Sequence, residues 1–337
     1  MIVVGKVDGT ALLSSERDKG ESIMKARFVT VQHGDQDRLA CCSRREFLGK
    51  TAAIALAGAA TPGAVASETQ GTGPSRWTMR LSTSSIHFMA LRIEEACARI
   101  ARLGFEAIDI WSAHAGCPHL DDVQKRLGAG GLRRILEKNN LKLFSFSVYR
   151  GGYPRYAKLL GQLGGGVAVR GSTRFDKGQP LTVQMRKFLE SLKPEIELAE
   201  KYDSYLAIEN HGHALLNTLD SLKAFVDLNQ SPRVGIALAP FHVQRLKASV
   251  VEAIRISGRQ LFFFYAWQRA STKSFNQLPG HGPTDFTPWI AALAEVGYRG
   301  YVNPFMHGEV EPDKMSAALA KAKTYLESCY RRAVSGS

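Results

Sequence analysis

The segment Tyr205–Ala214, YLAIENHGHA, joins a short apolar run to a carboxylate, an amide and two imidazoles. Glu209 follows the apolar residues directly, and His211 and His213 come just after it. A glutamate in this position is rarely core filling, because buried glutamates are usually paired or metal-bound. Imidazole is a common metal ligand and exchanges protons near neutral pH. The segment therefore predicts metal binding, acid–base chemistry, or both.

The other histidines follow the same pattern. Beyond residue 66 every histidine comes after a short apolar run, and none is predicted to lie within a helix. A single histidine in such a place is more often a surface or capping residue. Together, however, they favour one active-site face. These histidines are His87, His114, His119, His211, His213, His242, His281 and His307.

Eight apolar runs alternate with helical patterns along the chain. The predicted strands are 79–84, 106–111, 142–148, 166–171, 205–210, 234–239, 261–267 and 300–305. The predicted helices are 91–103, 120–138, 154–162, 181–201, 217–228, 247–257, 287–296 and 312–333. Eight such units in about 260 residues predict a single-domain (β/α)8 TIM barrel, in which the segments after the strands share one face. A doubly wound sheet is disfavoured, because the glycine-rich GQLGGGVAVRG precedes a strand instead of following one.

Alternation along the strands predicts which side chains face the barrel interior. A period of two places Glu209 and His211 on one side of strand 205–210. It places Ala237 and Ala239 inward on the next strand, with His242 at the rim. Two small inward residues leave room for a ligand or for large neighbouring side chains.

The first 66 residues predict an export signal. SRREFL at 43–48 is a twin-arginine pattern, an alanine-rich stretch follows at 51–60, and AVA at 64–66 is a small-residue cleavage site. We therefore expect export to the periplasm or cell exterior. The predicted organisation is a leader at 1–66, a linker at 67–76, the barrel at 77–332 and a tail at 333–337.

The composition of the 337 residues is globular, with 45% hydrophobic and 22% charged residues. The net charge is +13, of which the first 66 residues contribute +2. The basic residues are scattered over helical segments without interleaved aromatics, so nucleic-acid binding is disfavoured. No run reaches the about 18 apolar residues of a membrane span. Beyond the leader, Cys97, Cys117 and Cys329 are too few and too widely spaced for a disulfide framework, and Cys117 is expected to be the most exposed.

Four stretches carry a resemblance to a known family: LGFEAIDIW, AIENHG, VGIALAPFH and LPGHGPTDFTPWIAALAEVGYRGYV. They resemble the xylose-isomerase-like barrels, which include sugar-phosphate isomerases and epimerases and enzymes of the endonuclease IV type. The resemblance extends from Trp77 to about Arg332. It implies one divalent ion, commonly manganese, magnesium or zinc. It further implies ligands from strand five (Glu), strand six (Asp and His), strand seven (His) and strand eight (Glu).

This sequence matches the implied ligand set only in part. Glu209 matches the strand-five ligand and His242 the strand-six histidine, but the strand-six aspartate falls on Ala239. The strand-seven histidine falls within FFFYAW, and the strand-eight glutamate at or near Phe305. Either an ion is held differently, by Glu209 and His242 with nearby groups such as His281, His211 or His307, or the metal has been lost. In the second case the barrel performs metal-free acid–base chemistry or only binds a ligand.

We expect a carbohydrate isomerase, epimerase or related lyase that removes a proton next to a carbonyl. Glu209, His211 and His242 are the predicted catalytic residues. The predicted partner is a small carbohydrate, with or without phosphate; the oligomeric state is not predicted. The alternatives are an inactive carbohydrate-binding relative, which the missing ligands favour, and a phosphodiester-cleaving endonuclease, which the basic charge favours. The predicted substrate-binding residues are Asp109, His114, Arg170, Asn210, Trp267, Gln268, Asn303 and His307.

Overall fold

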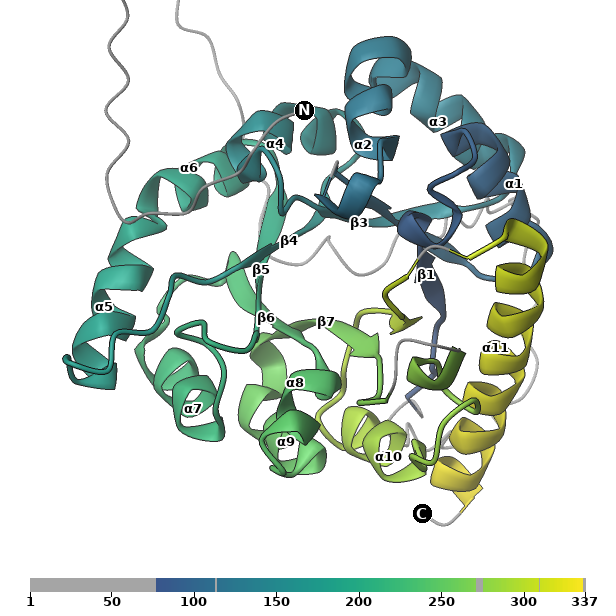
Figure 1. Cartoon of the computed structure of the whole chain (residues 1–337). Coiled ribbons are helices and arrows are strands. Elements are labelled where there is room, and N and C mark those ends of the chain that lie inside the picture. Colours follow the sequence, from purple (N-terminus) through teal and green to yellow (C-terminus); the bar gives the residue numbers. More distant parts are fainter. Residues whose placement is uncertain (1–76, 113, 271–274, 309, 336–337) are drawn as a thin grey trace, which may run out of the picture. The chain divides into compact units, whose positions relative to one another are not determined.

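Eight parallel strands form one sheet that curves into a barrel, with the helices around its outside (Figure 1). The structure, a computed structural model, describes residues 77–112, 114–270, 275–308 and 310–335. The predicted leader and linker at 1–76 and the last two residues of the predicted tail lie outside the described residues. The strands are β1 (Ser82–Ser84), β2 (Ala107–Trp111), β3 (Lys142–Ser147), β4 (Gly166–Gly171), β5 (Ser204–Glu209), β6 (Val234–Leu238), β7 (Leu261–Ala266) and β8 (Val302–Pro304).

The strands are hydrogen-bonded in chain order from β1 to β8, and the first and last strands meet. Leu81 and Val302 form a parallel bridge, and the Val302 amide donates to the Arg80 carbonyl oxygen at 2.9 Å. Each strand overlaps the apolar run that predicts it, with bounds that differ by three residues at most, and β5 begins one residue before its predicted range, at Ser204. The predicted (β/α)8 barrel is therefore confirmed.

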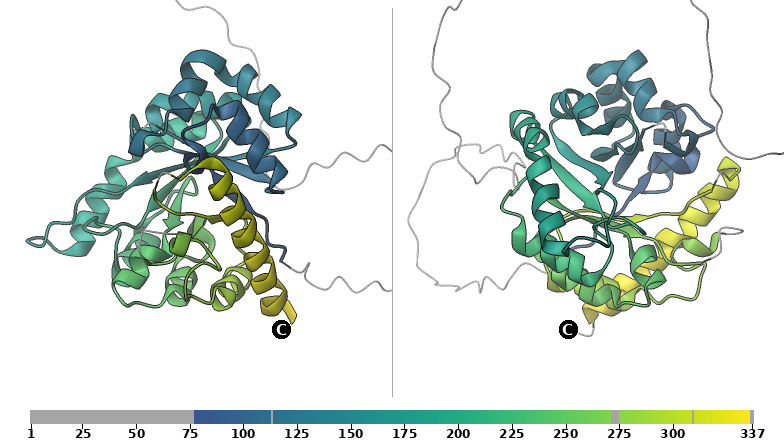
Figure 2. Two further views of the ribbon diagram at one scale, coloured as in Figure 1. Left: turned by 45° about the vertical axis from the view of Figure 1, so that its right-hand side comes forward. Right: turned by 60° about the vertical axis from the view of Figure 1, so that its left-hand side comes forward.

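The helices follow the strands and cover the outside of the barrel. The predicted helix 120–138 is divided by one π-helical turn, and the predicted helix 181–201 is divided at Leu192. Figure 2 shows the long last helix running along the outside of the barrel, next to α10. None of the described helices combines the length and apolar character needed to cross a membrane. The α-helices are α1 (Ile93–Arg102), α2 (His119–Asp122), α3 (Gly128–Lys138), α4 (Gly152–Gln162), α5 (Leu181–Ser191), α6 (Lys193–Lys201), α7 (Leu219–Leu228), α8 (Pro240–Arg245), α9 (Val250–Ser257), α10 (Thr287–Glu295) and α11 (Pro312–Ser335).

Short helical turns occupy several loops that the sequence left unassigned. His242 lies within α8, and His119 is the first residue of α2, so the prediction that no histidine lies in a helix is wrong for both. Helix α8 has six residues, which is too short to show a helical period, and it begins at Pro240, a residue favoured at a first helical position. The single turns are η1 (Ser85–Phe88), η2 (His114–Gly116), η3 (Val123–Leu127, π), η4 (Gly258–Gln260) and η5 (Phe275–Gln277).

Apolar side chains fill both the interior of the barrel and the layer between strands and helices. In the interior, Phe144 stacks on Phe263 with ring centroids 4.9 Å apart, and Tyr301 packs against Phe144. Ala237 and Ala239 face inward beside these large rings, as alternation predicts. The lower half of the barrel is thus a packed core.

The glycine-rich stretch before β4 forms a turn. Gly164, Gly165 and Gly166 all have positive φ, and they connect α4 to β4. At Gly165 a Cβ atom would lie 2.2 Å from the Asp203 carbonyl oxygen, so no larger residue fits there. These glycines are needed for the backbone conformation of the turn. This agrees with the prediction that the stretch is not a dinucleotide-binding motif.

The three cysteines of the barrel are free and buried. Cys97 and Cys329 lie on α1 and α11, where they pack into the outer apolar layer. Cys117 is also fully buried, with its Sγ 3.4 Å from His119 Nδ1, so the expectation that it is the most exposed is wrong. Burial raises the pKa of the Cys117 thiol to about 12, which keeps it protonated and unreactive.

Candidate active site

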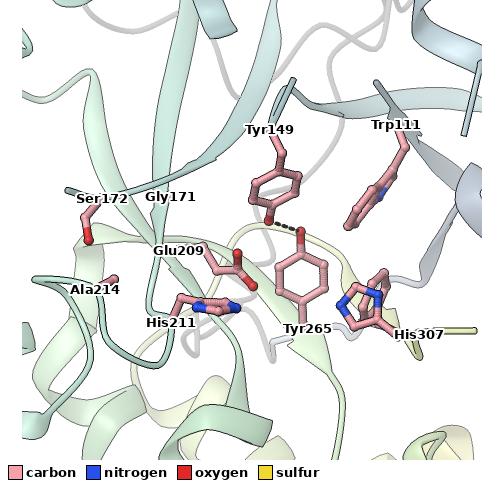
Figure 3. Close-up of a pocket in the computed structure, with 10 residues that line it drawn as sticks. Trp111, Tyr149, Gly171, Ser172, Glu209, His211, Ala214, Tyr265 and His307 are labelled. Carbon is pink, nitrogen blue, oxygen red and sulfur yellow. Dashed lines mark hydrogen bonds between the residues drawn. The ribbon is translucent and has the colours of Figure 1, made fainter. Parts of the chain in front are cut away.

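A pocket of about 220 Å³ opens at the carboxyl ends of the strands (Figure 3). Its walls come from the ends of β2, β4, β5 and β7 and from the segments that follow β3, β5 and β8. This is the face on which the sequence places the active site. The lining residues are Trp111, Tyr149, Gly171, Ser172, Glu209, His211, Ala214, Tyr265, Phe305 and His307.

Glu209 is the one carboxylate among the described residues that line the pocket. It ends β5, and only 7% of its surface is exposed. Burial raises the pKa of Glu209 to about 7, although a hydrogen bond with the Tyr149 hydroxyl lowers it in part. A carboxyl group with this pKa gains or loses a proton easily near neutral pH, which suits a general base or acid.

Two tyrosine hydroxyls meet beside Glu209. The Tyr149 and Tyr265 hydroxyl oxygens are hydrogen-bonded, 3.1 Å apart (Figure 3). The Tyr149 hydroxyl also bonds Glu209. Tyr265 contacts the Ser147 hydroxyl on its other side. Burial raises the pKa of both phenols well above the usual value, reinforced by the Glu209 charge at Tyr149 and by the Asp109 and Glu209 charges at Tyr265. Both therefore remain protonated donors.

Asp109 lies beneath the pocket with none of its surface exposed. Its carboxylate accepts hydrogen bonds from Ser84, Ser145 and Ser147 at 2.8–3.0 Å and from the Trp111 indole at 2.5 Å. Burial raises the pKa of Asp109 to about 6, against the lowering effect of these donors. The predicted substrate contact of Asp109 is not what the structure shows, because Asp109 holds Trp111 in place from below.

Aromatic rings form one wall of the pocket. Trp111 stacks on Phe305 with centroids 5.3 Å apart and planes 15° apart. Tyr149 contacts Trp111 with ring centroids 5.1 Å apart and planes 40° apart, and His307 meets Phe305 edge-on at 5.0 Å. Figure 3 shows Trp111 on the side of the pocket away from Glu209, so the pocket has an aromatic wall there.

The opposite wall is built from two loops joined by backbone hydrogen bonds. The Leu215 amide donates to the Thr173 carbonyl oxygen at 2.7 Å, and Arg174 forms an antiparallel bridge with Ala214. The Ser172 hydroxyl accepts from the Leu216 amide at 3.0 Å. The loop after β4 therefore depends on the loop after β5 for its position.

The imidazoles of His211 and His242 lie close together, with centroids 4.2 Å apart. His211 lines the pocket, and its Nδ1 is 3.0 Å from the Gly212 carbonyl oxygen. His242 is buried behind it, and neither ring nitrogen of His242 has a hydrogen-bond partner among the described residues. Burial, reinforced by His211 and Arg245, lowers the pKa of His242 to about 3, so its ring is neutral.

Three predicted substrate-binding amides are fully buried and bonded to the protein. Asn210 exchanges two hydrogen bonds with the backbone of Ala239, at 2.6 and 3.2 Å. Gln268 bonds the backbone of Leu278 and Thr284, at 2.8 and 2.9 Å. Asn303 donates to the Ser82 hydroxyl at 3.0 Å and lies 3.1 Å from the Ser84 hydroxyl. These amides connect strand ends and loops, and they do not line the pocket.

Of the remaining predicted substrate-binding residues with described side chains, one lines the pocket and two lie outside it. Arg170 projects away from the barrel interior and pairs with Glu195 of α6. The Trp267 ring stacks on Phe241 at 4.3 Å, outside the pocket lining. His307 does line the pocket. The backbone of His114 lies in η2, and its side chain is outside the described part of the chain.

Tyr149 and Tyr265 line the pocket, but neither is among the site residues that the sequence predicts, which are mainly charged residues, amides and histidines. Tyr149 stands two residues beyond β3, and Tyr265 is the inward residue near the end of β7. Both positions follow from the barrel register. A search that included every polar side chain at the strand ends would have found them.

A comparison with protein families matches residues 97–327 to the xylose isomerase-like TIM barrel. This chain belongs to that family. Among solved structures it is 16% identical to a 3-keto-D-glucoside 4-epimerase from E. coli, over 73% of this chain and 100% of the other, with a TM-score of 0.57. It is 17% identical to an L-ribulose 3-epimerase over 77% and 97%, with a TM-score of 0.60. At such identities the likeness shows the fold.

Another neighbour is a xylose isomerase-like TIM barrel/4-hydroxyphenylpyruvate dioxygenase fusion protein. The identity is 18% and the TM-score 0.61, and the match covers 77% of this chain but 44% of the fusion protein. A comparison with curated protein sequences gave no match.

The donor set of this xylose isomerase-like barrel does not fit the divalent ion that the family resemblance implies. His281 Nε2 is 3.0 Å from the Ala318 carbonyl oxygen of α11, away from the pocket. The predicted set of Glu209, His242 and His281 is thus not assembled. Within the described residues no three His, Cys, Asp or Glu side chains form a group that could hold an ion.

Proposed function

We propose that this protein is a sugar isomerase- or epimerase-like enzyme that moves a proton next to a carbonyl, without a resident metal ion. The observation that carries the proposal is Glu209, a buried carboxylate at the pocket whose pKa is raised to about 7. A protonation equilibrium near neutral pH is what proton abstraction from carbon needs. The epimerases among the structural neighbours support the same class of substrate.

The pocket favours a neutral monosaccharide or a ligand of similar size. Its volume of about 220 Å³ is below the roughly 300–1,000 Å³ of pockets for drug-sized ligands. The stacked Trp111 and Phe305 suit the apolar face of a sugar ring, and Glu209, His211 and Ser172 suit its hydroxyls. No Lys or Arg is among the described lining residues, so the pocket lacks the usual partners of a phosphate group.

Export by a twin-arginine signal is part of this proposal and rests on the leader sequence alone. Of the two alternatives, an inactive sugar-binding relative fits the same pocket. Binding alone, however, gives no reason to bury a carboxylate whose pKa is raised to about 7. A phosphodiester-cleaving enzyme needs a cluster of metal-binding side chains, and the described residues offer none.

Exchange of carbon-bound hydrogen tests the proposal. Keto- and aldo-sugars, each with and without phosphate, are incubated with the protein in D₂O and followed by proton NMR. We expect exchange next to the carbonyl of at least one neutral sugar, reduced about 100-fold or more in Glu209→Gln. The exposed Glu197→Gln is the matched control and keeps the wild-type rate.

Two outcomes contradict the proposal. Sugar-dependent thermal stabilisation without any hydrogen exchange supports the inactive binding protein instead. Exchange that persists in Glu209→Gln assigns the base to another residue.

A further inference from the structure

We propose that the paired hydroxyls of Tyr149 and Tyr265 form an oxyanion site, which stabilises the enolate-type oxygen that develops when Glu209 removes a proton from the ligand. The inference rests on the proposed function and adds the group that takes the electrostatic place of a metal ion. Three observations carry it: the arrangement of the hydroxyls, their backing by a buried network, and their position against Glu209.

The two hydroxyls meet inside the pocket and not behind it. Both tyrosines line the pocket, and their oxygens are 3.1 Å apart. Figure 3 shows the pair between the Glu209 carboxyl group and the Trp111 ring. A ligand stacked on Trp111 with its carbonyl towards Tyr149 therefore has both the base and a donor within one small cavity. Neutral phenols at a water-poor site are effective donors to a developing oxyanion.

A buried polar network holds the pair in place. Tyr265 contacts Ser147, and the Ser147 hydroxyl donates to Asp109, with its oxygen 2.9 and 3.0 Å from the two carboxylate oxygens. The single Tyr149 proton goes to Glu209 or to a ligand oxygen, so the Tyr149 oxygen accepts the Tyr265 proton, and this bond makes the Tyr149 hydroxyl a stronger donor. Asp109 and Ser147 are thus positioning residues, and Tyr149 is the group that contacts the ligand.

The Tyr149 hydroxyl is close enough to Glu209 for its hydrogen bond to change partner during the proposed reaction. Before proton removal the Tyr149 hydroxyl bonds the Glu209 carboxylate. As Glu209 takes the proton, its charge disappears and the ligand oxygen becomes negative, so the Tyr149 hydrogen bond follows the charge from one oxygen to the other. An interaction of this kind is stronger in the transition state than in the ground state and so accelerates the chemical step.

The step is balanced without a co-reactant. The carbon–hydrogen electron pair becomes the carbon–carbon double bond of the enediolate, and the carbonyl π pair moves onto oxygen. Glu209 returns the proton to the neighbouring carbon, and the hydroxyl proton passes from one ligand oxygen to the other. The product is an isomer of the ligand, and no atom or electron is gained or lost.

Binding of 4-nitrophenolate tests the oxyanion site independently of any sugar. The probe is flat and anionic on oxygen, and its absorbance shifts when the oxygen accepts a strong hydrogen bond. Its neutral analogue 4-nitroaniline serves as the matched ligand. We expect the purified protein to prefer the phenolate, and Tyr149→Phe to weaken phenolate binding about tenfold while it leaves 4-nitroaniline unchanged. Tyr265→Phe should weaken phenolate binding by a smaller factor of about three.

Two further variants separate an oxyanion site from a structural role. Tyr153→Phe removes a buried hydroxyl that lies outside the pocket lining, 2.6 Å from Ser204 Oγ, and should leave phenolate binding unchanged. Glu209→Gln imitates the neutral base formed after proton removal and should strengthen phenolate binding several-fold. Circular dichroism confirms that each variant is folded.

The inference is overturned if the protein does not prefer the phenolate to 4-nitroaniline, or if folded Tyr149→Phe binds the phenolate as the wild type does. These results would leave the proposed function intact wherever sugar hydrogen exchange still depends on Glu209. Conversely, a phenolate preference that depends on Tyr149, without exchange in any sugar, would keep the oxyanion site and remove the proposed substrate class.

Discussion

At the scale of single residues, the environment of Glu209 favours its protonated form. The pKa is about 7 in the folded protein and about 4.5 when the chain is unfolded. Between these values the folded state binds more protons than the unfolded state, so the free energy of unfolding falls as the pH rises from about 4.5 to about 7. The ionised Glu209 carboxylate thus lowers stability above neutral pH.

Replacing Glu209 by glutamine should reverse this loss. We expect Glu209→Gln to raise the free energy of unfolding at pH 8 by on the order of 2 kcal/mol, and to change it little at pH 4.5, where the glutamate is already protonated in the fold. Urea unfolding at the two pH values measures the difference. Exposed Glu197→Gln provides the control, and equal effects of Glu209→Gln at both pH values would show that burial does not raise the Glu209 pKa.

Asp109 shows why residue types alone do not identify a contact with a ligand. Like Glu209, it is a carboxylate within an apolar run, and the sequence predicts that both contact the ligand. The structure separates them through neighbours from other strands: three serines and the Trp111 indole enclose the Asp109 carboxylate completely. Such neighbours become known only once the barrel register is known.

At the scale of elements, the strands were predictable from short apolar runs. All eight predicted strands are present because each is an apolar run followed by a helical pattern, as expected for parallel strands that are buried on both faces. Helix α8 was missed because six residues cannot display a helical period. The predicted metal set failed for a related reason: the loop that carries His281 turns towards α11, and a loop direction is not encoded in a period.

The turn before β4 allows a test with adjacent glycines. Gly164 and Gly165 both have positive φ, but a Cβ at Gly164 meets nothing within 4 Å, whereas at Gly165 it meets the Asp203 carbonyl oxygen. We expect Gly164→Ala to cost about 1 kcal/mol from backbone strain alone, and Gly165→Ala to cost at least about 2 kcal/mol more. Chemical unfolding of both variants measures this difference, and similar costs would contradict the close approach of β5 to this turn.

At the scale of the whole molecule, the barrel could be predicted from the sequence. The residues that complete the pocket beside Glu209 could not. The order of eight β-then-α units fixes the face on which strand ends meet, and Glu209, His211 and His307 do lie together at the pocket. The family resemblance then directed attention to metal ligands. The two tyrosines at the pocket went unnoticed because their role depends on a 3.1 Å contact between β7 and the segment after β3.

Metal removal tests the donor set on the intact protein. Because no three suitable side chains converge within the described residues, we expect chelation followed by dialysis to leave the unfolding temperature unchanged. Addition of manganese, magnesium or zinc should likewise give no saturable stabilisation, since an ion that binds the folded state alone would raise stability by mass action. A stoichiometric ion that survives purification, or a saturable rise in the unfolding temperature, would contradict the metal-free site.

The aromatic stack in the lower barrel has a kinetic consequence. Phe144, Phe263 and Tyr301 fill the interior below the pocket, so ligands enter and leave through the same opening. In the proposed reaction, product and substrate would share this one opening and one pocket. We therefore expect product inhibition to be competitive with substrate.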